Sequence, residues 1–392
     1  MHVQNERLNK PAIHVPDRLI LVVQPRHSDK PLHSRFVRSH SRLRTTLSHV
    51  MRTNLILLML CVITHLTVNH AYGQTATKNN DDPDLGISTE FGDRVLEYDF
   101  DSFNVGIAEY PDGPTGATVF HFPKGARMSV DVRGGSPGVI GDYGFVHAIS
   151  LAGGSLFGLE AASGVAAGLL AKNDYKADWT AIPLVSGGII FDFGIRNNSI
   201  YPDKRLGRTA LEHAVPNRFP LGARGAGISA TVGKSIGFHG MEHAGQGAAF
   251  TETGGIKVFA CVVLNAMGAV VDRDGQVVRG HLDQETGERI TFIKAIERMI
   301  ETAETQIQPP AGNTTLTVVI TNQSADRFSL DQVAKQVHSS MSRAIQPFQT
   351  DSDGDTLWMV STGEVDVTPW SSAGLGELAS DVVWDAVLTA HP

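Results

Sequence analysis

A threonine at the start of a predicted β-strand is the residue of this chain with most potential for chemistry. Residues 313–320 read Asn-Thr-Thr-Leu-Thr-Val-Val-Ile, a β-branched run typical of a strand, and Pro309-Pro310-Ala311-Gly312 interrupts the chain before it. A threonine hydroxyl is a weak nucleophile at neutral pH and needs a nearby base. Cleavage between Asn313 and Thr314 would supply one, because the new α-amine has an ordinary pKa of about 7.7–8.0. Most threonine-rich strands are only structural, so other segments must support this hypothesis.

Lys234 is the second candidate, because it follows the small, uncharged residues Ser229-Ala230-Thr231-Val232-Gly233. A lysine held among such residues can be buried with a lowered pKa and then serve as a base. The competing interpretations are a surface lysine and a phosphate-binding loop. The loop motif requires a glycine five residues before Gly233, where Ile228 stands, so its spacing fails.

Asp353 and Asp355 belong to an alternating acidic segment, residues 351–356. A calcium loop of the EF-hand type requires glycine at its sixth and glutamate at its twelfth position. Thr356 and Thr362 stand there instead, so the match fails. Two interpretations remain: an acidic turn before a strand, or carboxylates at the mouth of a strand that orient an amine or a lysine.

Asn265 follows an apolar strand and precedes Ala266-Met267-Gly268. It is either a turn asparagine or an amide donor to a developing oxyanion. Other hydrolase motifs give no support. Gly-x-Ser-x-Gly occurs at 134–138 and at 233–237, but neither serine opens a predicted helix, as a nucleophile elbow requires. No His-Glu-x-x-His or paired-cysteine motif for zinc occurs in the sequence. We therefore expect neither a metal nor a cofactor.

The elements that must position these residues alternate between strands and helices, which predicts an α/β or α+β layered domain. The expected strands are 118–122, 128–132, 188–193, 258–264, 270–272, 314–320 and 356–360. The expected helices are 155–170, 209–214, 292–307, 329–345 and 375–388. In 292–307, apolar residues at steps of three and four predict one buried face.

The formal net charge of −8 argues against nucleic acid as a partner. The first 52 residues are rich in Arg, Lys and His, and the apolar run Leu55–Ile63 follows. This run is shorter than the roughly 20 residues of a membrane span but fits the core of a secretory signal. The small residues of Ala71-Tyr72-Gly73 then provide a cleavage site.

A signal that began at residue 1 would be too long, so Met51 is the expected start. Residues 1–50 are then a non-native extension, 51–73 the signal peptide, and 74–93 a flexible lead-in. We expect a secreted or periplasmic protein without a stable membrane partner; an N-terminal membrane anchor is the alternative. Signal removal leaves Cys261 as the sole cysteine, inside an apolar run, so it is expected to be a small buried hydrophobe.

Six segments occur together in an order that is specific as a set. They are 132–138 (Val-Arg-Gly-Gly-Ser-Pro-Gly), 153–159 (Gly-Gly-Ser-Leu-Phe-Gly-Leu), 230–234 (Ala-Thr-Val-Gly-Lys), 264–272 (Leu-Asn-Ala-Met-Gly-Ala-Val-Val-Asp), 313–316 (Asn-Thr-Thr-Leu) and 353–356 (Asp-Gly-Asp-Thr). The set resembles the DmpA-type self-processing aminopeptidases and β-peptidyl aminopeptidases, and most closely their nylon-oligomer endo-hydrolase branch. The resemblance extends from about Gly86 to the C-terminus.

The resemblance implies a four-layer αββα sandwich of the N-terminal-nucleophile type, as in DmpA and ornithine acetyltransferase. It implies cleavage between Asn313 and Thr314 into an α chain, 94–313, and a β chain, 314–392, that stay together in one domain. Thr314 would be the nucleophile and Lys234 would lie next to its amine. Asn265 would help form the oxyanion hole, and Asp353 and Asp355 would orient the amine and the lysine.

The function implied is a self-processing amidase that acts on peptide-like or nylon-type oligoamide bonds. The alternative is an aminopeptidase, a D-amino-acid esterase-amidase or a β-peptidyl aminopeptidase of the same fold. A non-catalytic or nucleotide-binding secreted protein is a more remote one. The expected partners are a small peptide or oligoamide substrate and further copies of the chain, with a tetramer of αβ units favoured. Arg224 stands where relatives often carry an uncharged residue, so the substrate cannot be copied from them.

Overall fold

The computed structural model describes residues 78–302, 312–366 and 371–391. The predicted extension and signal peptide lie outside these residues. In the part of the chain that is described, no helix combines the length and the apolar character needed to cross a bilayer.

Within these residues, ten strands form one hydrogen-bonded sheet with the order β11-β12-β15-β17-β3-β5-β6-β4, to which β2 and β7 are attached. The central pairing of β15 with β17 is parallel, whereas β12 pairs with β15 and β17 with β3 in antiparallel fashion. The strands are β2 (Asn104–Tyr110), β3 (Thr115–Val132), β4 (Val139–Ile140), β5 (Phe145–Ala152), β6 (Val185–Ile189), β7 (Val215–Pro216), β11 (Gln246–Thr253), β12 (Ile256–Asn265), β15 (Thr314–Gln323) and β17 (Thr356–Val365).

The long strand β3 belongs to two layers. Its first half pairs with β2 and β5, and its second half, from Arg127 to Val132, pairs with β17. The register with β5 shifts between His121 and Ala126, which is the kind of irregularity that lets a strand bend. The hydrogen-bonded sheet can therefore fold over on itself and place two strand layers face to face.

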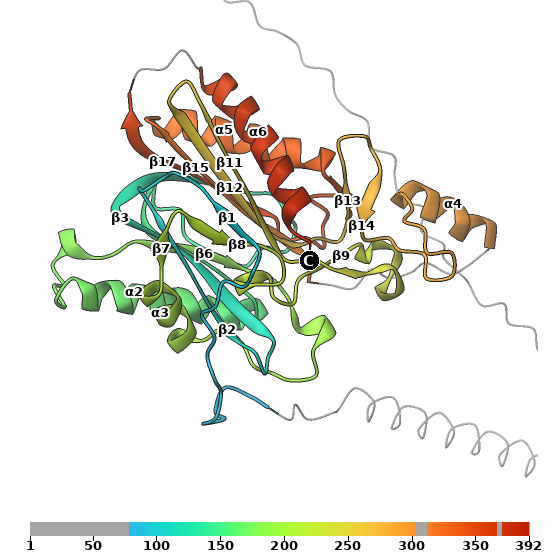
Figure 1. Cartoon of the computed structure of the whole chain (residues 1–392), viewed down its shortest axis with the longest axis horizontal. Helices are drawn as coiled ribbons and strands as arrows, with labels where there is room; N and C mark the ends of the chain where they lie inside the picture. The colour runs from blue at the N-terminus through green and yellow to red at the C-terminus, as the bar shows by residue number, and fades with distance from the viewer. Residues whose placement is uncertain (1–77, 303–311, 367–370, 392) are drawn as a thin grey trace, which may run out of the picture. The chain divides into compact units, whose positions relative to one another are not determined.

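Helices cover the two outer faces (Figure 1). Helices α2 (Glu160–Lys172) and α3 (Lys204–Glu212) pack on each other and on the layer of β2, β3 and β5. Helices α5 (Arg327–Ser340) and α6 (Ser372–Thr389) pack on the layer of β11, β12 and β17. Three of these helices begin with an oxygen-bearing side chain that accepts a backbone N–H, the arrangement that stabilises a helix start; these are Asp203, Asp326 and Ser371.

Alternation along the central strands separates the hydrophobic core into layers. In β12, Val258, Ala260 and Val262 face α5 and α6, whereas Phe259 and Cys261 face the space between the two strand layers. A third cluster lies between the other strand layer and α2 and α3. Period-two alternation of this kind is what a sheet with two covered faces requires. The predicted αββα sandwich is confirmed, and Cys261 is buried as predicted.

Shorter elements surround the sandwich. The pairs β1–β8 and β9–β10 and the three-stranded sheet β14-β13-β16 are separate from the large sheet. Their bounds are β1 (Val95–Glu97), β8 (Arg218–Pro220), β9 (Thr231–Val232), β10 (Glu242–His243), β13 (Ala269–Val271), β14 (Val277–Arg279) and β16 (Ile345–Gln346).

Several element bounds differ from the sequence prediction. The two strands predicted at 118–122 and 128–132 are both parts of β3. The helix predicted at 329–345 ends at Ser340, and a 3-10 turn and β16 follow it. Helix α4 (Phe292–Thr302) does not bury the whole apolar face predicted for it, because Ile293 is 65% and Ile300 is 74% exposed.

Part of the predicted flexible lead-in is packed on the domain. Leu85 is buried in the cluster beneath α2 and α3. Ser88 exchanges backbone hydrogen bonds with Glu109, which extends the edge of β2. The polar composition of residues 74–93 did not predict this packing. The packing depends on one buried leucine and on backbone hydrogen bonds, and neither requires an apolar segment.

Candidate active site

Thr314 is the first residue of β15, at the end of a strand held between β12 and β17. In the antiparallel register with β12, Thr314 lies directly opposite Asn265, the last residue of that strand. The β-branched residues after Thr314 form a strand that is buried on both faces, so the position of the hydroxyl is set by the centre of the fold. The topology therefore brings together two of the predicted residues that lie far apart in the sequence.

The carbonyl before Thr314 is held by two donors. Thr314 Oγ donates to the Asn313 oxygen at 2.5 Å, and the Gly354 N–H donates to the same oxygen at 2.7 Å. Backbone N–H groups aimed at a carbonyl oxygen stabilise the negative charge that develops there during attack. A Cβ at residue 354 would lie 2.6 Å from Thr314 Oγ. Glycine at this position thus leaves room for the hydroxyl beside the donor.

Lys234 lies in a 3-10 turn, Lys234–Ile236, and its side chain is buried, with 4% of the residue exposed. Its Nζ donates to the backbone oxygen of Asn265 at 2.9 Å and to the Asn265 side-chain oxygen at 3.0 Å. Burial lowers the pKa of Lys234 to about 7, although the charges of Asp353 and Asp355 act in the opposite direction. A substantial fraction of the amine is therefore neutral near pH 7 and can accept a proton.

The carboxylates of Asp353 and Asp355 are buried and bind backbone donors. Asp353 accepts from Met267 N at 3.2 Å and from Thr350 N at 3.1 Å. Asp355 accepts from Thr315 N at 2.6 Å and from Gln349 N at 3.0 Å. Burial, followed by the charge of Asp353, raises the pKa of Asp355 above its usual range.

Neither of these carboxylates forms an ion pair with Lys234 among the described residues. They act on the lysine through their charge at longer range, and Asp355 holds the backbone of the residue that follows the nucleophile. Their oxygens accept hydrogen bonds from backbone N–H groups. These bonds favour the interpretation of the segment as an acidic turn over its interpretation as a calcium loop.

Asn265 uses both ends of its amide. The side-chain oxygen accepts from Thr231 N at 3.1 Å and from Lys234. Its Nδ2 donates to the carbonyls of Phe191, at 3.0 Å, and of Gly312, at 3.2 Å. The amide is thus oriented with its oxygen toward the lysine and its N–H groups toward the carbonyls of Phe191 and Gly312.

The glycine-rich bend 133–138 forms backbone hydrogen bonds with the acidic turn. Gly134 N donates to the Asp355 backbone oxygen, and Ser136 N donates to that of Asp353 at 2.8 Å. A Cβ at residue 134 would lie 2.3 Å from the Asp353 oxygen, so this approach requires glycine. The chemistry of the individual residues did not predict that this bend and Gly354 belong to the site. The position of Gly354 between two aspartates was the one feature of the sequence that pointed to it.

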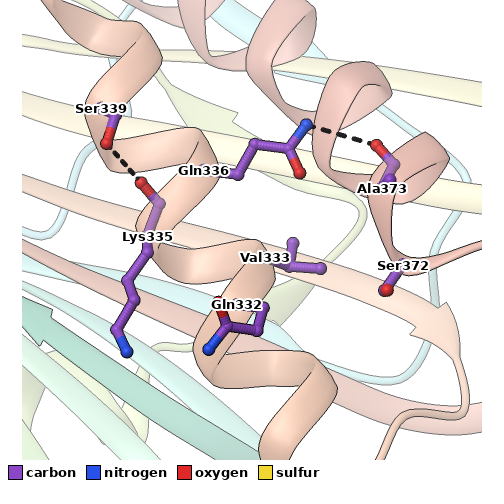
Figure 2. A pocket seen from close by; sticks show the side chains of 7 residues that line it. All are labelled: Gln332, Val333, Lys335, Gln336, Ser339, Ser372 and Ala373. Atoms are coloured by element: carbon purple, nitrogen blue, oxygen red, sulfur yellow. Dashed lines mark hydrogen bonds between the residues drawn. The ribbon is translucent and has the colours of Figure 1, made fainter.

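Two other features lie apart from this arrangement. Arg224 pairs with Glu109 at 3.4 Å, and the same carboxylate also accepts from Gly225 N. A cavity of about 380 Å³ lies between α5 and α6, where Gln336 donates to Ala373 (Figure 2). Lys335 is the sole ionisable residue that lines it, so it lacks the nucleophile, base and oxyanion donors that meet at Thr314.

The layered fold with a threonine nucleophile candidate at the start of a central strand defines an N-terminal-nucleophile hydrolase. A solved structure with this fold is similar over 74% of this chain and 84% of its own, with a TM-score of 0.53 and 15% identity: the L-aminopeptidase D-Ala-esterase/amidase of Ochrobactrum anthropi. The profile of peptidase family S58 matches residues 99–391. This chain belongs to peptidase family S58.

Curated relatives support the same class. The 6-aminohexanoate-oligomer endohydrolases of Agromyces sp. (strain KY5R) and Paenarthrobacter ureafaciens are each 48% identical over 323 residues. These alignments cover 79% of this chain and 90% of each relative. The chain is accordingly an amide hydrolase of the N-terminal-nucleophile type, and the predicted resemblance is confirmed.

Proposed function

We propose that this protein cuts its own backbone between Asn313 and Thr314 and then hydrolyses oligoamide bonds with the freed N-terminal threonine. The observation that carries the proposal is the pair of contacts on the Asn313 carbonyl, from the Thr314 hydroxyl and the Gly354 N–H. A nucleophile and an oxyanion donor thus lie on the same carbonyl before any substrate is present.

Self-cleavage begins with attack of Thr314 Oγ on the Asn313 carbonyl carbon. In the uncut chain the nitrogen of Thr314 is an amide and cannot act as a base, so Lys234 is the base available for the hydroxyl proton. Collapse of the tetrahedral intermediate transfers the acyl group from nitrogen to oxygen and protonates the new α-amine. Water then hydrolyses the ester, leaving an Asn313 carboxylate and a free Thr314 hydroxyl and amine.

Hydrolysis of a substrate repeats both steps of this chemistry, the attack on an amide carbonyl and the hydrolysis of the resulting ester. The Thr314 amine, assisted by Lys234, removes the hydroxyl proton while Oγ attacks the substrate carbonyl. The oxyanion is stabilised by the Gly354 N–H, and the leaving amine takes the proton. Asn265 binds the upstream carbonyl and Lys234. Water releases the acyl group. Asp353 and Asp355 keep the amine and the lysine in a negative field, which maintains the lysine pKa near neutrality instead of lower.

The proposed substrate is a linear oligoamide of the nylon type, on the basis of the 48% identity to 6-aminohexanoate-oligomer endohydrolases. Aminopeptidase or esterase activity on the same fold is the alternative. We further propose that residues 94–313 and 314–392 remain associated as α and β chains and that αβ units assemble into a homo-oligomer, with a tetramer favoured. Export through the signal at 51–73 completes the proposal.

A substrate with a blocked N-terminus separates the two activities. Purified protein is incubated with an N-acetylated 6-aminohexanoate oligomer, and new amines are quantified, with Thr314→Ala as the matched control. An endohydrolase releases amine from the blocked oligomer, and the control does not. Cleavage of unblocked oligomers alone would instead favour an aminopeptidase, and equal release by the Thr314→Ala variant would contradict the proposed nucleophile.

A further inference from the structure

The two residues before the scissile bond occupy a defined set of contacts. Asn313 is buried, and its N–H donates to the Ser352 carbonyl at 3.3 Å. Asn313 also forms a parallel bridge with Asp353, so the chain runs in extended form beside the acidic turn. The Gly312 carbonyl accepts from Asn265 Nδ2 at 3.2 Å. A second amide upstream of the scissile carbonyl is therefore recognised on both its N–H and its C=O.

Chemistry connects this arrangement with substrate binding. The ester formed in self-cleavage joins the Asn313 acyl carbon to Thr314 Oγ. The acyl-enzyme formed from a substrate joins the substrate acyl carbon to the same oxygen. The two species differ only in their acyl groups and in the strand pairing that each makes. The space that holds Gly312 and Asn313 is hence the space that a substrate acyl group must enter.

Phe191 limits what this space accepts. Gly312 has φ +90°, a backbone conformation that favours glycine, and a Cβ placed on it would lie 2.5 Å from Cγ of Phe191. Rotation of the ring would not remove the clash, because Cβ of Phe191 would lie 2.7 Å from the same added atom. A substituent at this position would thus require a shift of the Phe191 backbone, whose carbonyl accepts from Asn265 Nδ2 at 3.0 Å.

We propose that the place of Gly312 and Asn313 is the acyl subsite of the mature enzyme, and that it selects acyl groups with a second amide upstream and an unbranched carbon at the position of Gly312 Cα. The inference rests on the proposed function and names the acyl group that this subsite takes, with Phe191 as the specificity-determining residue. Peptides with side chains at this position are selected against.

The test compares two nitroanilides that differ by one methyl group, acetyl-Gly-Asn-p-nitroanilide and acetyl-Ala-Asn-p-nitroanilide. The processed wild-type enzyme, Phe191→Gly and Phe193→Gly are assayed for kcat/KM on both. Alanine at residue 191 would keep the Cβ, which lies 2.7 Å from the added carbon. Phe193 is the matched control, because its ring packs against that of Phe191, at 5.8 Å between centroids, and is not among the nearest atoms to Gly312. Inhibition of oligomer hydrolysis by acetyl-Gly-Asn and acetyl-Ala-Asn is the second readout.

The wild-type enzyme is expected to prefer the glycyl substrate by about 10- to 200-fold, the range typical of one poorly accommodated methyl group. Phe191→Gly should reduce this ratio at least about fivefold, and Phe193→Gly should preserve it. Acetyl-Gly-Asn should inhibit the wild-type enzyme more strongly than acetyl-Ala-Asn.

An enzyme that is cut at residue 314 and hydrolyses oligoamides, but treats the two compounds alike in both readouts, would overturn the subsite alone. An equal loss of preference in both phenylalanine variants would also overturn it. A chain that remains uncut and releases no amine from oligomers would instead contradict the proposed function.

Discussion

Gly354 lies against the hydroxyl of Thr314, with room for a hydrogen but not for a methyl group. A Cβ at residue 354 would come within 2.6 Å of Thr314 Oγ and 2.9 Å of the Ser136 carbonyl. The Gly354 N–H meanwhile donates to the Asn313 oxygen that Thr314 is proposed to attack. Nucleophile, donor and scissile carbonyl are therefore fixed together by one residue without a side chain.

Gly354→Ala should slow self-cleavage about 10²-fold, the effect expected when a reacting group is displaced by around an ångström. The measurement is the fraction of uncut chain on a denaturing gel over time after synthesis. Gly86→Ala is the matched control, because no atom lies within 4 Å of the added Cβ, and it should process at the wild-type rate. Normal processing of Gly354→Ala would show that the space beside Thr314 Oγ is not needed.

Asn265→Ala should lower the turnover of amide substrates about 10²-fold, the effect expected when a reacting group is displaced by around an ångström, because it removes the amide that binds Lys234 and the upstream carbonyl. The variant loses the amide that also fixes Lys234, so steady-state kinetics should show the loss in kcat. Asn322→Ala removes another buried asparagine, one that binds Lys257 N and Gly255 O at the far end of β15. That control should lose thermal stability and keep kcat, whereas an equal loss of kcat would point to a general structural effect.

The pH dependence of self-cleavage should report Lys234 directly. Thr314 has no free amine in the uncut chain, so the pKa of about 7 that burial gives Lys234 should govern the reaction. The rate should rise with pH through about 7 and level off above it, because the neutral amine is the base. The measurement uses the slow Gly354→Ala precursor, and a flat profile between pH 6 and 8 would contradict the role of Lys234.

The same lowered pKa has a consequence for stability. Between about pH 7 and the ordinary lysine value, the unfolded chain binds a proton at Lys234 that the folded chain lacks. The contribution of this group therefore makes the free energy of unfolding rise with pH across that window. Lys234→Met should flatten the rise in denaturant titrations, with the Thr314→Ala background used to keep the chain uncut. An unchanged slope would mean that Lys234 titrates normally in the folded protein.

Asp355→Asn should impair both processing and stability, because the carboxylate accepts two backbone N–H groups. An amide group offers only one oxygen and turns an NH₂ toward the other donor, at an expected cost of about 1–3 kcal/mol. Thermal unfolding and the gel assay measure the two effects. Asp351→Asn is the control from the same turn, since Asp351 is exposed and should tolerate the change. Equal behaviour of the two variants would contradict the role given to Asp355.

The sequence predicts the layered fold well because its strongest signals are local. The run from Thr314 to Ile320 is β-branched at every position except Leu316, which strongly favours a strand. The C-terminal end of α5 was less predictable, because residues 341–345 are compatible with a longer helix. In the structure, Met341–Arg343 form a 3-10 turn and Ile345 begins β16. The bend in β3 also had no clear local signal, because it depends on which strands pair with each half.

The site was predictable in its residue types but not in its contacts. A lysine among small residues indicated burial, and the structure places Lys234 in the interior. Its binding to Asn265 follows from the packing of its turn against the end of β12, where Gly233 N donates to Gly268 O and Ser235 N donates to Met267 O. Only the folded chain defines these contacts. The hydrogen bond from Gly354 N to the Asn313 oxygen was not predictable either. The sequence shows only a glycine between two aspartates.

N-terminal sequencing of the smaller fragment of freshly purified, active protein tests the central claim most directly. The account predicts a fragment that begins Thr-Thr-Leu-Thr, produced by the wild-type chain and by Thr314→Ser, and absent from Thr314→Ala. Active protein that consists of one intact chain, or a fragment that begins at any other residue, would contradict it.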